Sequence, residues 1–261
     1  MQKRHLDGKL YFEELAYSTQ KYIIPYINEY YPVSGDMRIL EIGCGAGGNL
    51  LPFLKLGCEV TGFDFSKSRI AEARQILDAD NNEKVHLFCD DVFNVSNLGE
   101  FDIILVRDVI EHIPDKKHFF VHIKDFMKKE GIMYFAFPAW YMPFGGHQQL
   151  CRNKLLSHLP FYHIFPKPVY RWLLSVFKEN KSTIDELMSI KDCRITVEGF
   201  RRYAKENGYA IFQETLYFIN PHYEIKFNLK PRKLIPLIGR IPFVRNFFTT
   251  GCFYIIKQSS I

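Results

Sequence analysis

The stretch "RILEIGCGAGGNLLPFLKLGCEVTGFD", residues 38–64, decides the fold. An apolar run leads into Gly43, Gly45 and Gly48, which are spaced as G-x-G-x-x-G, and a helical segment, a second apolar run and Asp64 follow. This order is typical of a βαβ unit that binds an adenosine cofactor, whose ribose hydroxyls need a carboxylate after the second strand. A nicotinamide dinucleotide, a flavin dinucleotide and S-adenosylmethionine all fit it.

Strand-like and helix-like segments alternate on both sides of this unit. Apolar runs predict strands at residues 37–42, 59–63, 84–89, 101–106, 131–137, 209–219 and 249–257, and helical spacing predicts helices at 9–32, 47–57, 66–80, 115–129 and 196–208. Strands that are buried on both faces need crossover helices. The sequence therefore predicts an α/β fold with a Rossmann-like, doubly wound, mostly parallel sheet of seven strands.

Residues 138–195 interrupt the alternation with a stretch rich in proline and aromatic residues. An insertion of this length after the fifth strand is typical of a lid. We expect a single domain over residues 1–261. Its parts are an N-terminal helical segment at 1–35, a cofactor-binding core at 36–137, a helical lid at 138–195 and the rest of the sheet at 196–261, with a basic loop at 220–248.

Two acidic residues discriminate between the cofactors. Glu41 stands two positions before the first glycine, where its charge would oppose a pyrophosphate but would suit an ammonium group and a sulfonium. Asp90 directly follows the third predicted strand, where it can accept a hydrogen bond from an adenine amino group. Both residues favour S-adenosylmethionine.

Four motifs, in order, resemble those of one known family. They are "ILEIGCGAGGNL" at 39–50, "GFDFS" at 62–66, "FCDDVF" at 88–93 and "FDIILVRDVIEHIPD" at 101–115. Together they are similar to the motifs of class I S-adenosylmethionine-dependent methyltransferases of the ubiquinone- and menaquinone-biosynthesis type. The resemblance covers residues 36–137 well and residues 196–256 by pattern only.

The resemblance implies S-adenosylmethionine as the cofactor and S-adenosylhomocysteine as its product. It implies that backbone at three glycines approaches the methionine part of the cofactor, namely Gly43, Gly45 and Gly47. It also places Glu41 near the ammonium group, Asp64 at the ribose hydroxyls and Asp90 at the adenine.

Two histidines are candidate catalytic bases, because an imidazole with a pKa near 6.5 can accept a proton at neutral pH. His112 follows the fourth predicted strand, and a structural contact with a backbone carbonyl is the alternative role. His147 begins the lid, and Gly145 and Gly146 before it permit a sharp turn that could aim its ring at a substrate.

Three aromatic residues of the lid, Trp140, Tyr141 and Phe144, could form a wall beside the sulfonium or stack on a flat substrate. Packing inside the lid is the alternative. Residues 101–108 lack the Asn/Asp-Pro-Pro-Tyr motif of enzymes that methylate the amino groups of nucleic-acid bases. We therefore expect a small-molecule acceptor and no nucleic acid.

Composition limits the remaining classes. The six cysteines form no C-x-x-C pair, which predicts reduced thiols, and neither a signal peptide nor a membrane span is visible, so we expect a cytoplasmic protein. His118 and His122 lie one helical turn apart without a third ligand at a familiar zinc spacing, so we expect no metal. The oligomeric state is left open.

Positive charge is concentrated near the C-terminus. The net charge is +5, yet residues 220–261 hold seven Lys/Arg against the single Glu224. Residues 226–248 carry six Lys/Arg, no acid and many apolar residues, which predicts weak peripheral binding to an anionic surface such as the inner membrane face. The alternative is that the apolar residues pack on the sheet and the charges are solvated.

The sequence thus favours a methyltransferase that acts on a small-molecule acceptor, and the basic, apolar segment at 226–248 would suit an amphiphilic one such as a quinone precursor or a lipid-linked molecule. A dinucleotide-dependent oxidoreductase and a non-enzymatic S-adenosylmethionine-binding protein are the alternatives. Sequence names neither the acceptor nor the atom that is methylated.

Overall fold

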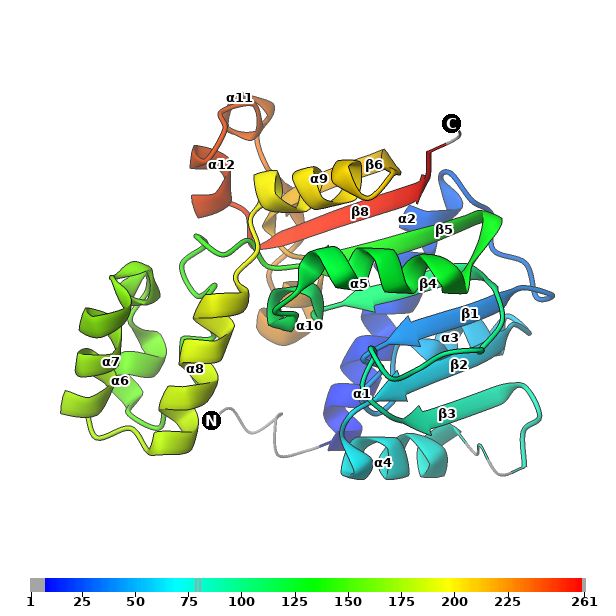
Figure 1. The fold of residues 1–261 in the computed structure, drawn as a ribbon, viewed down its shortest axis with the longest axis horizontal. Helices are drawn as coiled ribbons and strands as arrows, with labels where there is room; N and C mark the ends of the chain where they lie inside the picture. The colour runs from blue at the N-terminus through cyan, green and yellow to red at the C-terminus, as the bar shows by residue number, and fades with distance from the viewer. Residues whose placement is uncertain (1–7, 78, 80, 260–261) are drawn as a thin grey trace.

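A central sheet organises the part of the chain that the computed structural model describes, residues 8–77, 79 and 81–259. The first seven residues of the predicted N-terminal segment and the last two of the predicted domain lie outside this part. Within it, eight strands are arranged in the order β3-β2-β1-β4-β5-β8-β6-β7 (Figure 1). They are β1 (Arg38–Ile42), β2 (Glu59–Asp64), β3 (Val85–Cys89), β4 (Phe101–Arg107), β5 (Met127–Phe137), β6 (Tyr209–Ile219), β7 (Arg232–Lys233) and β8 (Gly251–Gln258).

Strands β1 to β5 run parallel to one another, whereas β8, β6 and β7 continue the sheet in antiparallel pairs. This arrangement confirms the predicted doubly wound, mostly parallel α/β sheet. The count of seven strands missed β7, a two-residue strand inside the predicted loop at 220–248. Lys233 pairs there with Tyr217 along the open edge of β6. Two residues carry no periodicity, so sequence cannot reveal such a strand.

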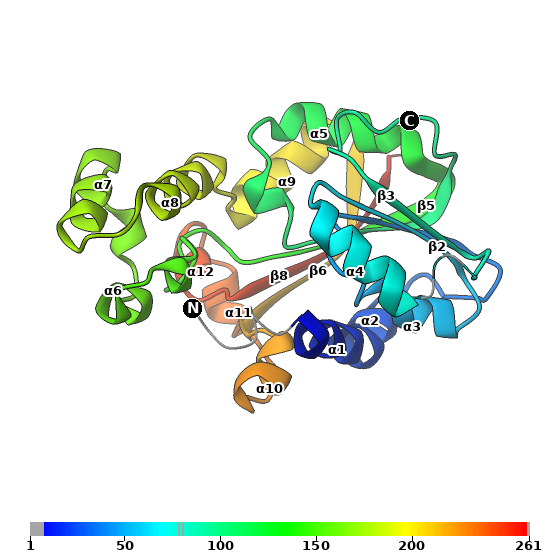
Figure 2. The same ribbon diagram turned by 90° about the horizontal axis from the view of Figure 1, so that it is seen from below.

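Helices cover both faces of the sheet (Figure 2). One face carries α1 (Gly8–Ser18), a π-helical turn (Thr19–Ile23), α2 (Ile24–Asn28), α3 (Leu50–Lys55) and α4 (Lys67–Leu77), and the other carries α5 (Lys116–His122) and α9 (Val197–Glu206). Successive residues of β1 face opposite layers. Ile39 packs in the cluster that contains Phe53 of α3, and Leu40 packs in the cluster that contains Phe120 of α5. Burial on both faces explains why the strands read as continuous apolar runs.

The helix predicted at 115–129 ends earlier than expected. Helix α5 stops at His122, a 3₁₀ turn follows at Ile123–Phe126, and Met127 already belongs to β5. Met127 is buried and pairs with Phe101 at the start of β4. Pairing with the neighbouring strand therefore overrides the helical pattern of the last residues.

Residues 138–195 form a helical lobe beside the sheet (Figure 1). Its helices are α6 (Lys154–His158), α7 (Lys167–Val176) and α8 (Lys181–Cys193), and they share an apolar cluster that includes Leu156, Tyr170 and Leu187. The buried side chain of Lys116 donates to the backbone carbonyl of Cys193, where α8 ends. The predicted insertion after the fifth strand is thus present and helical, and its action as a lid stays a prediction.

Short helices occupy the basic C-terminal part: α10 (His222–Phe227), α11 (Pro236–Gly239) and α12 (Val244–Phe247). Helix α10 packs against α1, and Glu224 of α10 accepts a hydrogen bond from Lys21 at 2.7 Å. Across the described ranges, the helices are too short or too polar to cross a bilayer. Helix α10 therefore lies on the face of the sheet that carries the N-terminal helix, whereas residues 243–246 contact the start of α9 on the other face.

The start of α9 provides a test of this local structure. The hydroxyl of Thr196 caps the helix by accepting from the backbone N–H of Gly199 at 3.0 Å. We expect Thr196→Ala to lower the free energy of unfolding by about 1 kcal/mol, because the N–H loses its partner. Urea unfolding measures the change. Ser182→Ala, at an exposed position of α8, is the control, and an equal effect of both substitutions would contradict the capping role.

Candidate active site

A cavity of about 290 Å³ opens where β1, β2 and β4 end. The order of the sheet changes direction between β1 and β4, and ligands of open α/β sheets bind in the crevice that this change creates. Residues 42–43, 63–65, 90–93, 108–109 and 112–114 line the cavity. Four predicted site residues are among them, namely Gly43, Asp64, Asp90 and His112.

Asp64, the last residue of β2, holds the neighbouring backbone together. Its Oδ2 accepts from the N–H of Gly45 at 3.0 Å, and its Oδ1 accepts from the N–H of Ser66 at 2.9 Å. Its backbone carbonyl accepts from the N–H of Asp90. Asp64 is only 8% exposed, so the carboxylate is held at the cavity edge in one orientation. A carboxylate fixed there suits a pair of ribose hydroxyls.

The glycine turn after β1 needs its glycines for two reasons. Gly43 has a φ of +70°, and a Cβ there would lie 2.5 Å from Cγ2 of Val109, across the cavity wall. Gly47 has a φ of +82°, and a Cβ there would lie 2.7 Å from Cδ1 of Leu77 on α4. Gly43 therefore leaves room at the cavity, whereas Gly47 permits close packing of a helix. Gly45 contributes its N–H to Asp64.

Glu41 lies behind the cavity at the end of β1. It is 1% exposed, its Oε1 accepts from Nδ2 of Asn49 at 2.5 Å, and its Oε2 has no hydrogen-bond partner in the described structure. Burial raises the pKa of Glu41 to about 8. Asn49 in turn accepts from Nη1 of Arg107 at 2.7 Å. A buried oxygen without a partner is costly, and the ammonium group of a ligand would satisfy it.

Asp90 stands at the opposite side of the cavity, just after β3. It is exposed, and its Oδ1 accepts from the N–H of Asp91 at 2.8 Å and from Nδ2 of Asn94 at 3.3 Å. Apolar side chains of Phe65 and Val92 line the cavity nearby. An oriented carboxylate beside apolar walls fits a flat ring that carries an amino group.

A cluster of three titratable residues lies beside the cavity. Glu111 and His112 belong to a 3₁₀ turn after β4 (Ile110–His112), and His147 comes from the lid with a left-handed φ of 56°. The ring centroids of the two histidines are 5.0 Å apart, and donor atoms of all three residues lie within 4.8 Å of one another. Both predicted histidines therefore meet at the boundary between core and lid.

The cluster is held largely without charge. Glu111 is 5% exposed, and among the described residues neither of its carboxyl oxygens has a hydrogen-bond partner. Burial raises the pKa of Glu111 well above its ordinary value. Burial, and then the neighbouring His112, lowers the pKa of His147 to about 3, and burial followed by Lys116 lowers that of His112. The side chain of His112 is exposed and that of His147 is half-buried. Solvent reaches both rings although protein atoms surround them, as on the wall of a cleft.

One carboxylate and two imidazoles also form a donor set for a divalent metal ion. From the sequence we expect no metal, because His118 and His122 lack a third ligand. Glu111, His112 and His147 are the group in the described structure that could hold one. His147 lies far from the others in sequence, so its spacing carried no signal.

Two charged residues at the mouth of the cavity, Arg107 and Asp108, were not predicted from the sequence. Asp108 lines the cavity with a φ of 54°, and its half-exposed carboxylate lies 3.6 Å from Nε of Arg107. Arg107 also donates through Nη1 to Oγ of Ser18 at 3.4 Å, so the end of α1 lies beside this mouth. The available signal was a charged pair directly after an apolar strand, at the edge where such folds bind ligands.

The three predicted aromatic residues lie outside the cavity lining. Trp140 is 3% exposed and packs in the lid, with its ring 4.8 Å from that of His163. Tyr141 stacks on Phe247 at 5.3 Å, and the carbonyl of Phe144 accepts from the N–H of His147. For Trp140 the structure thus shows the alternative packing role, and contact of Tyr141 and Phe144 with an acceptor stays a prediction.

Comparison with known proteins agrees with this geometry. A family profile described as a methyltransferase domain matches residues 40–133. A ubiquinone biosynthesis O-methyltransferase of Rhodopseudomonas palustris (strain HaA2) is 39% identical over 101 residues, which are 38% of this chain and 39% of that protein. Another of the same name, from Bartonella tribocorum, is 32% identical over 184 residues, 66% of this chain and 72% of that protein.

A solved structure shows the same fold. The S-adenosylmethionine-dependent methyltransferase from Clostridium acetobutylicum superposes with a TM-score of 0.57 at 14% identity, over 93% of this chain and 92% of that one. This likeness shows the fold. The relative from Bartonella tribocorum, together with the matching profile, shows the family: the chain belongs to the class I S-adenosylmethionine-dependent methyltransferases. The chain belongs to the ubiquinone-biosynthesis-like subgroup of that family, whose cofactor is S-adenosylmethionine.

The pKa of Glu41 predicts how stability depends on pH. A carboxyl whose pKa is about 8 in the folded state and near 4.5 when unfolded stabilises the fold below pH 4.5, and this contribution is lost as pH rises toward 8. Glu41→Gln should remove up to about 1.4 kcal/mol per pH unit from that slope. Urea unfolding between pH 5 and 8, in about half-unit steps, measures it.

Glu13→Gln, at an exposed position of α1, is the matched control and should leave the slope unchanged. An unaltered slope in Glu41→Gln would show that the folded state holds Glu41 ionised.

Proposed function

We propose that this protein transfers a methyl group from S-adenosylmethionine to a small-molecule acceptor with an ionisable hydroxyl or amine. The observation that carries the proposal is the meeting of His112 from the core and His147 from the lid beside the cofactor cavity. The fold supplies the cofactor site, and the two rings supply proton acceptors where an acceptor molecule would enter. The relatives named above act, by their names, in ubiquinone biosynthesis.

Each residue of the site has a part in the proposed reaction. S-adenosylmethionine supplies an electrophilic methyl group, and Asp64 with Asp90 holds its ribose and adenine. Glu41 meets the ammonium group through the oxygen that has no partner. His147 or His112 takes the acceptor's proton as the methyl group moves, and Asp108 orients the acceptor at the cavity mouth. Alignment and exclusion of water are the main work of the protein in such a displacement.

The low pKa of His147 keeps the ring unprotonated, which a proton acceptor requires. A ring with a pKa of about 3 is neutral at pH 7 and carries a lone pair, although it is a weak base until a negative partner stabilises its charged form. The buried carboxyl of Glu111 lies within 4.8 Å and would be that partner in its ionised form, which the charged ring in turn favours. We therefore assign Glu111 to the support of the base.

The acceptor is proposed to be amphiphilic, as a quinone precursor or a lipid-linked molecule would be. Residues 226–248 combine exposed apolar side chains with basic ones and lie next to the lid, where Phe247 stacks on Tyr141. Weak binding of this segment to an anionic membrane surface would bring the site to such an acceptor.

The other two readings explain less. A dinucleotide would place a pyrophosphate near Glu41, and the buried acid opposes it. If the protein only bound S-adenosylmethionine, its function would not explain the pair of imidazoles beside the cavity or the left-handed backbone of His147.

Cofactor binding tests the role of Asp64. We expect Asp64→Ala to weaken the affinity for S-adenosylhomocysteine about ten- to hundredfold, because the ribose loses a charged acceptor. Isothermal titration measures the affinity, and thermal unfolding without ligand checks that the variant folds. Asp185→Ala, on the far surface of α8, is the control. Unchanged affinity in a folded Asp64→Ala protein would remove Asp64 from the site.

Turnover tests His147. Asn tolerates the left-handed backbone, so His147→Asn removes the imidazole with little strain. We expect a loss of about 10²- to 10⁴-fold in methyl transfer with cofactor affinity retained. The assay follows labelled methyl groups into quinone-precursor and lipid fractions, and His158→Asn, on the outer surface of the lid, is the control.

Full turnover by His147→Asn would exclude it as the base. Reversible loss of activity on chelation, restored by a divalent metal, would instead assign the two histidines and Glu111 as ligands.

A further inference from the structure

The segment at residues 227–248 exposes an unusual amount of apolar surface. The exposed large side chains are Phe227, Leu229, Ile235, Leu237, Ile241, Phe243, Val244, Phe247 and Phe248. Exposed basic residues alternate with them, namely Lys230, Arg232, Lys233 and Arg240. A contiguous stretch of this kind on a protein surface marks an interaction site.

Phe243 is the most constrained member of this set. Its backbone has a φ of 63° and a ψ of −46°, a conformation that is strained for any residue with a side chain, yet the ring is 66% exposed. Core packing does not explain the strain, because the ring is mostly in solvent. The turn directs an apolar side chain outward at a cost in free energy.

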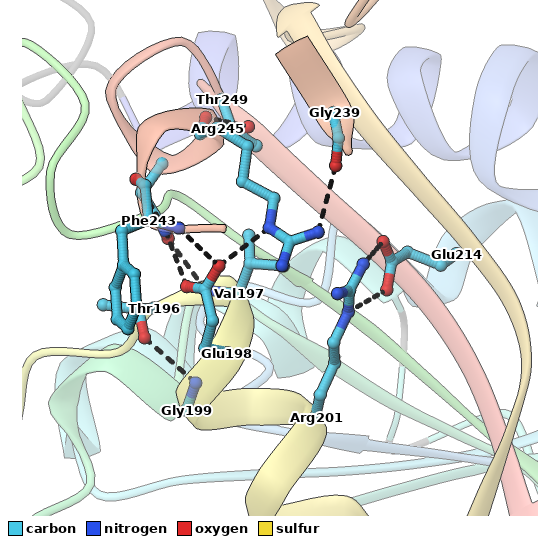
Figure 3. Close-up of polar contacts among 11 residues, drawn as sticks. Thr196, Val197, Glu198, Gly199, Arg201, Glu214, Gly239, Phe243, Arg245 and Thr249 are labelled. Carbon is cyan, nitrogen blue, oxygen red and sulfur yellow. Dashed lines mark hydrogen bonds and ion pairs between the residues drawn. The ribbon is translucent and has the colours of Figure 1, made fainter. Parts of the chain in front are cut away.

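A buried polar network fixes this turn to the start of α9 (Figure 3). Oε1 of Glu198 accepts from the N–H of Phe243 at 3.0 Å and from Nε of Arg245 at 2.7 Å, and Oε2 accepts from Nδ2 of Asn246 at 2.7 Å. Arg245 is 6% exposed and Asn246 is fully buried. Burial by itself would raise the pKa of Glu198, but these hydrogen bonds outweigh burial and lower the pKa to about 2, so the charge persists at neutral pH.

The network is closed on both sides. Arg245 also donates through Nη1 to the carbonyl of Gly239 at 3.0 Å, and Asn246 accepts from the N–H of Val197 at 2.9 Å. The turn at residues 240–244 is therefore fixed at its base on a helix of the core, and its tip projects. Such a construction is the opposite of a loose surface loop.

We propose that the turn at residues 240–244 is a rigid wedge by which the protein inserts Phe243 into an anionic lipid surface. This inference deepens the proposed access to an amphiphilic acceptor and rests on it. Ile241 and Val244 flank the wedge and would enter the interface with it, while Arg240 and Lys233 would contact the headgroups. Glu198 and Arg245 are positioning residues that keep the tip outward.

Charge selects lipid as the occupant. Residues 225–248 contain six Lys/Arg and no acid. Arg245 is buried in the network and Lys226 lies over the ring of Phe227 at 5.2 Å, which leaves four exposed basic residues for headgroups. Each basic side chain near an anionic surface contributes a favourable interaction, and exposed apolar side chains add burial in the interfacial layer. Helices α11 and α12 have four residues each, and α11 begins at a proline. The surface therefore consists of short projecting turns and not of one extended helical face.

Vesicle binding tests the wedge with the full chain. Co-sedimentation uses vesicles of phosphatidylcholine alone and of phosphatidylcholine with an equal amount of phosphatidylglycerol, at low salt. The wild type should pellet with the anionic vesicles and much less with the neutral ones. Phe243→Ser should weaken the binding about tenfold, because one aromatic side chain no longer enters the apolar layer. Phe212→Ser, an exposed phenylalanine of β6, is the matched control and should bind as the wild type does.

A second variant reports on the position of the ring. Anionic vesicles should shift the fluorescence emission of Phe243→Trp to the blue, and brominated acyl chains should quench it. The wild type, which contains Trp140 and Trp172, gives the background emission that is subtracted. Glu198→Gln, which weakens the hold on Phe243 and Arg245, should reduce vesicle binding while leaving S-adenosylhomocysteine affinity unchanged.

Equal binding of the wild type and Phe243→Ser, absence of wild-type binding to anionic vesicles, or equal binding to both vesicle types would overturn the wedge. None of these readouts uses methyl transfer. A failure of the wedge is therefore distinguishable from a failure of the proposed enzyme activity.

Discussion

The carboxylate of Asp64 is the contact on which the site depends. It accepts from the backbone of the glycine turn after β1 and from the turn after β2, so that two loops which begin on adjacent strands form one rigid edge. The strands themselves end at this edge because parallel pairing places their carboxyl ends together. The carboxylate adds to the bonds that the N–H groups of Gly43 and Cys44 donate to the carbonyl of Phe63, and together these contacts fix the glycine turn at the cavity.

A second layer of polar contacts connects this edge to the N-terminal helix. Glu41, Asn49 and Arg107 form a chain of hydrogen bonds that continues to Ser18 and Thr19 near the end of α1. The chain carries charge into a buried place, where each charged group needs a partner. One oxygen of Glu41 still has none. The polar contacts on the cofactor side are thus already formed without a ligand, and the oxygen of Glu41 is the acceptor that remains for one.

The proposed acceptor side is assembled differently, from elements that are remote in sequence. His112 follows β4, His147 comes from the lid, and Tyr223 on α10 has its pKa raised to about 12 by burial and then by Asp108. Packing of α10 on α1 and the bond from Lys116 to the end of α8 bring these parts together. A site made from separate elements can change its acceptor through the lid while the sheet stays the same.

The sequence by itself determined the sheet and the cofactor edge. Apolar runs, the glycine spacing and the acids that follow strands are local signals, and they predicted the doubly wound, mostly parallel sheet and the residues Gly43, Asp64 and Asp90, which line the cavity. Tertiary structure alone decided the meeting of His147 with Glu111 and His112, the packing of Trp140 in the lid, the short strand β7 and the strained turn at Phe243. The physical reason is that these features depend on contacts between residues far apart in the chain. The energies of such contacts cannot be read from a local sequence pattern.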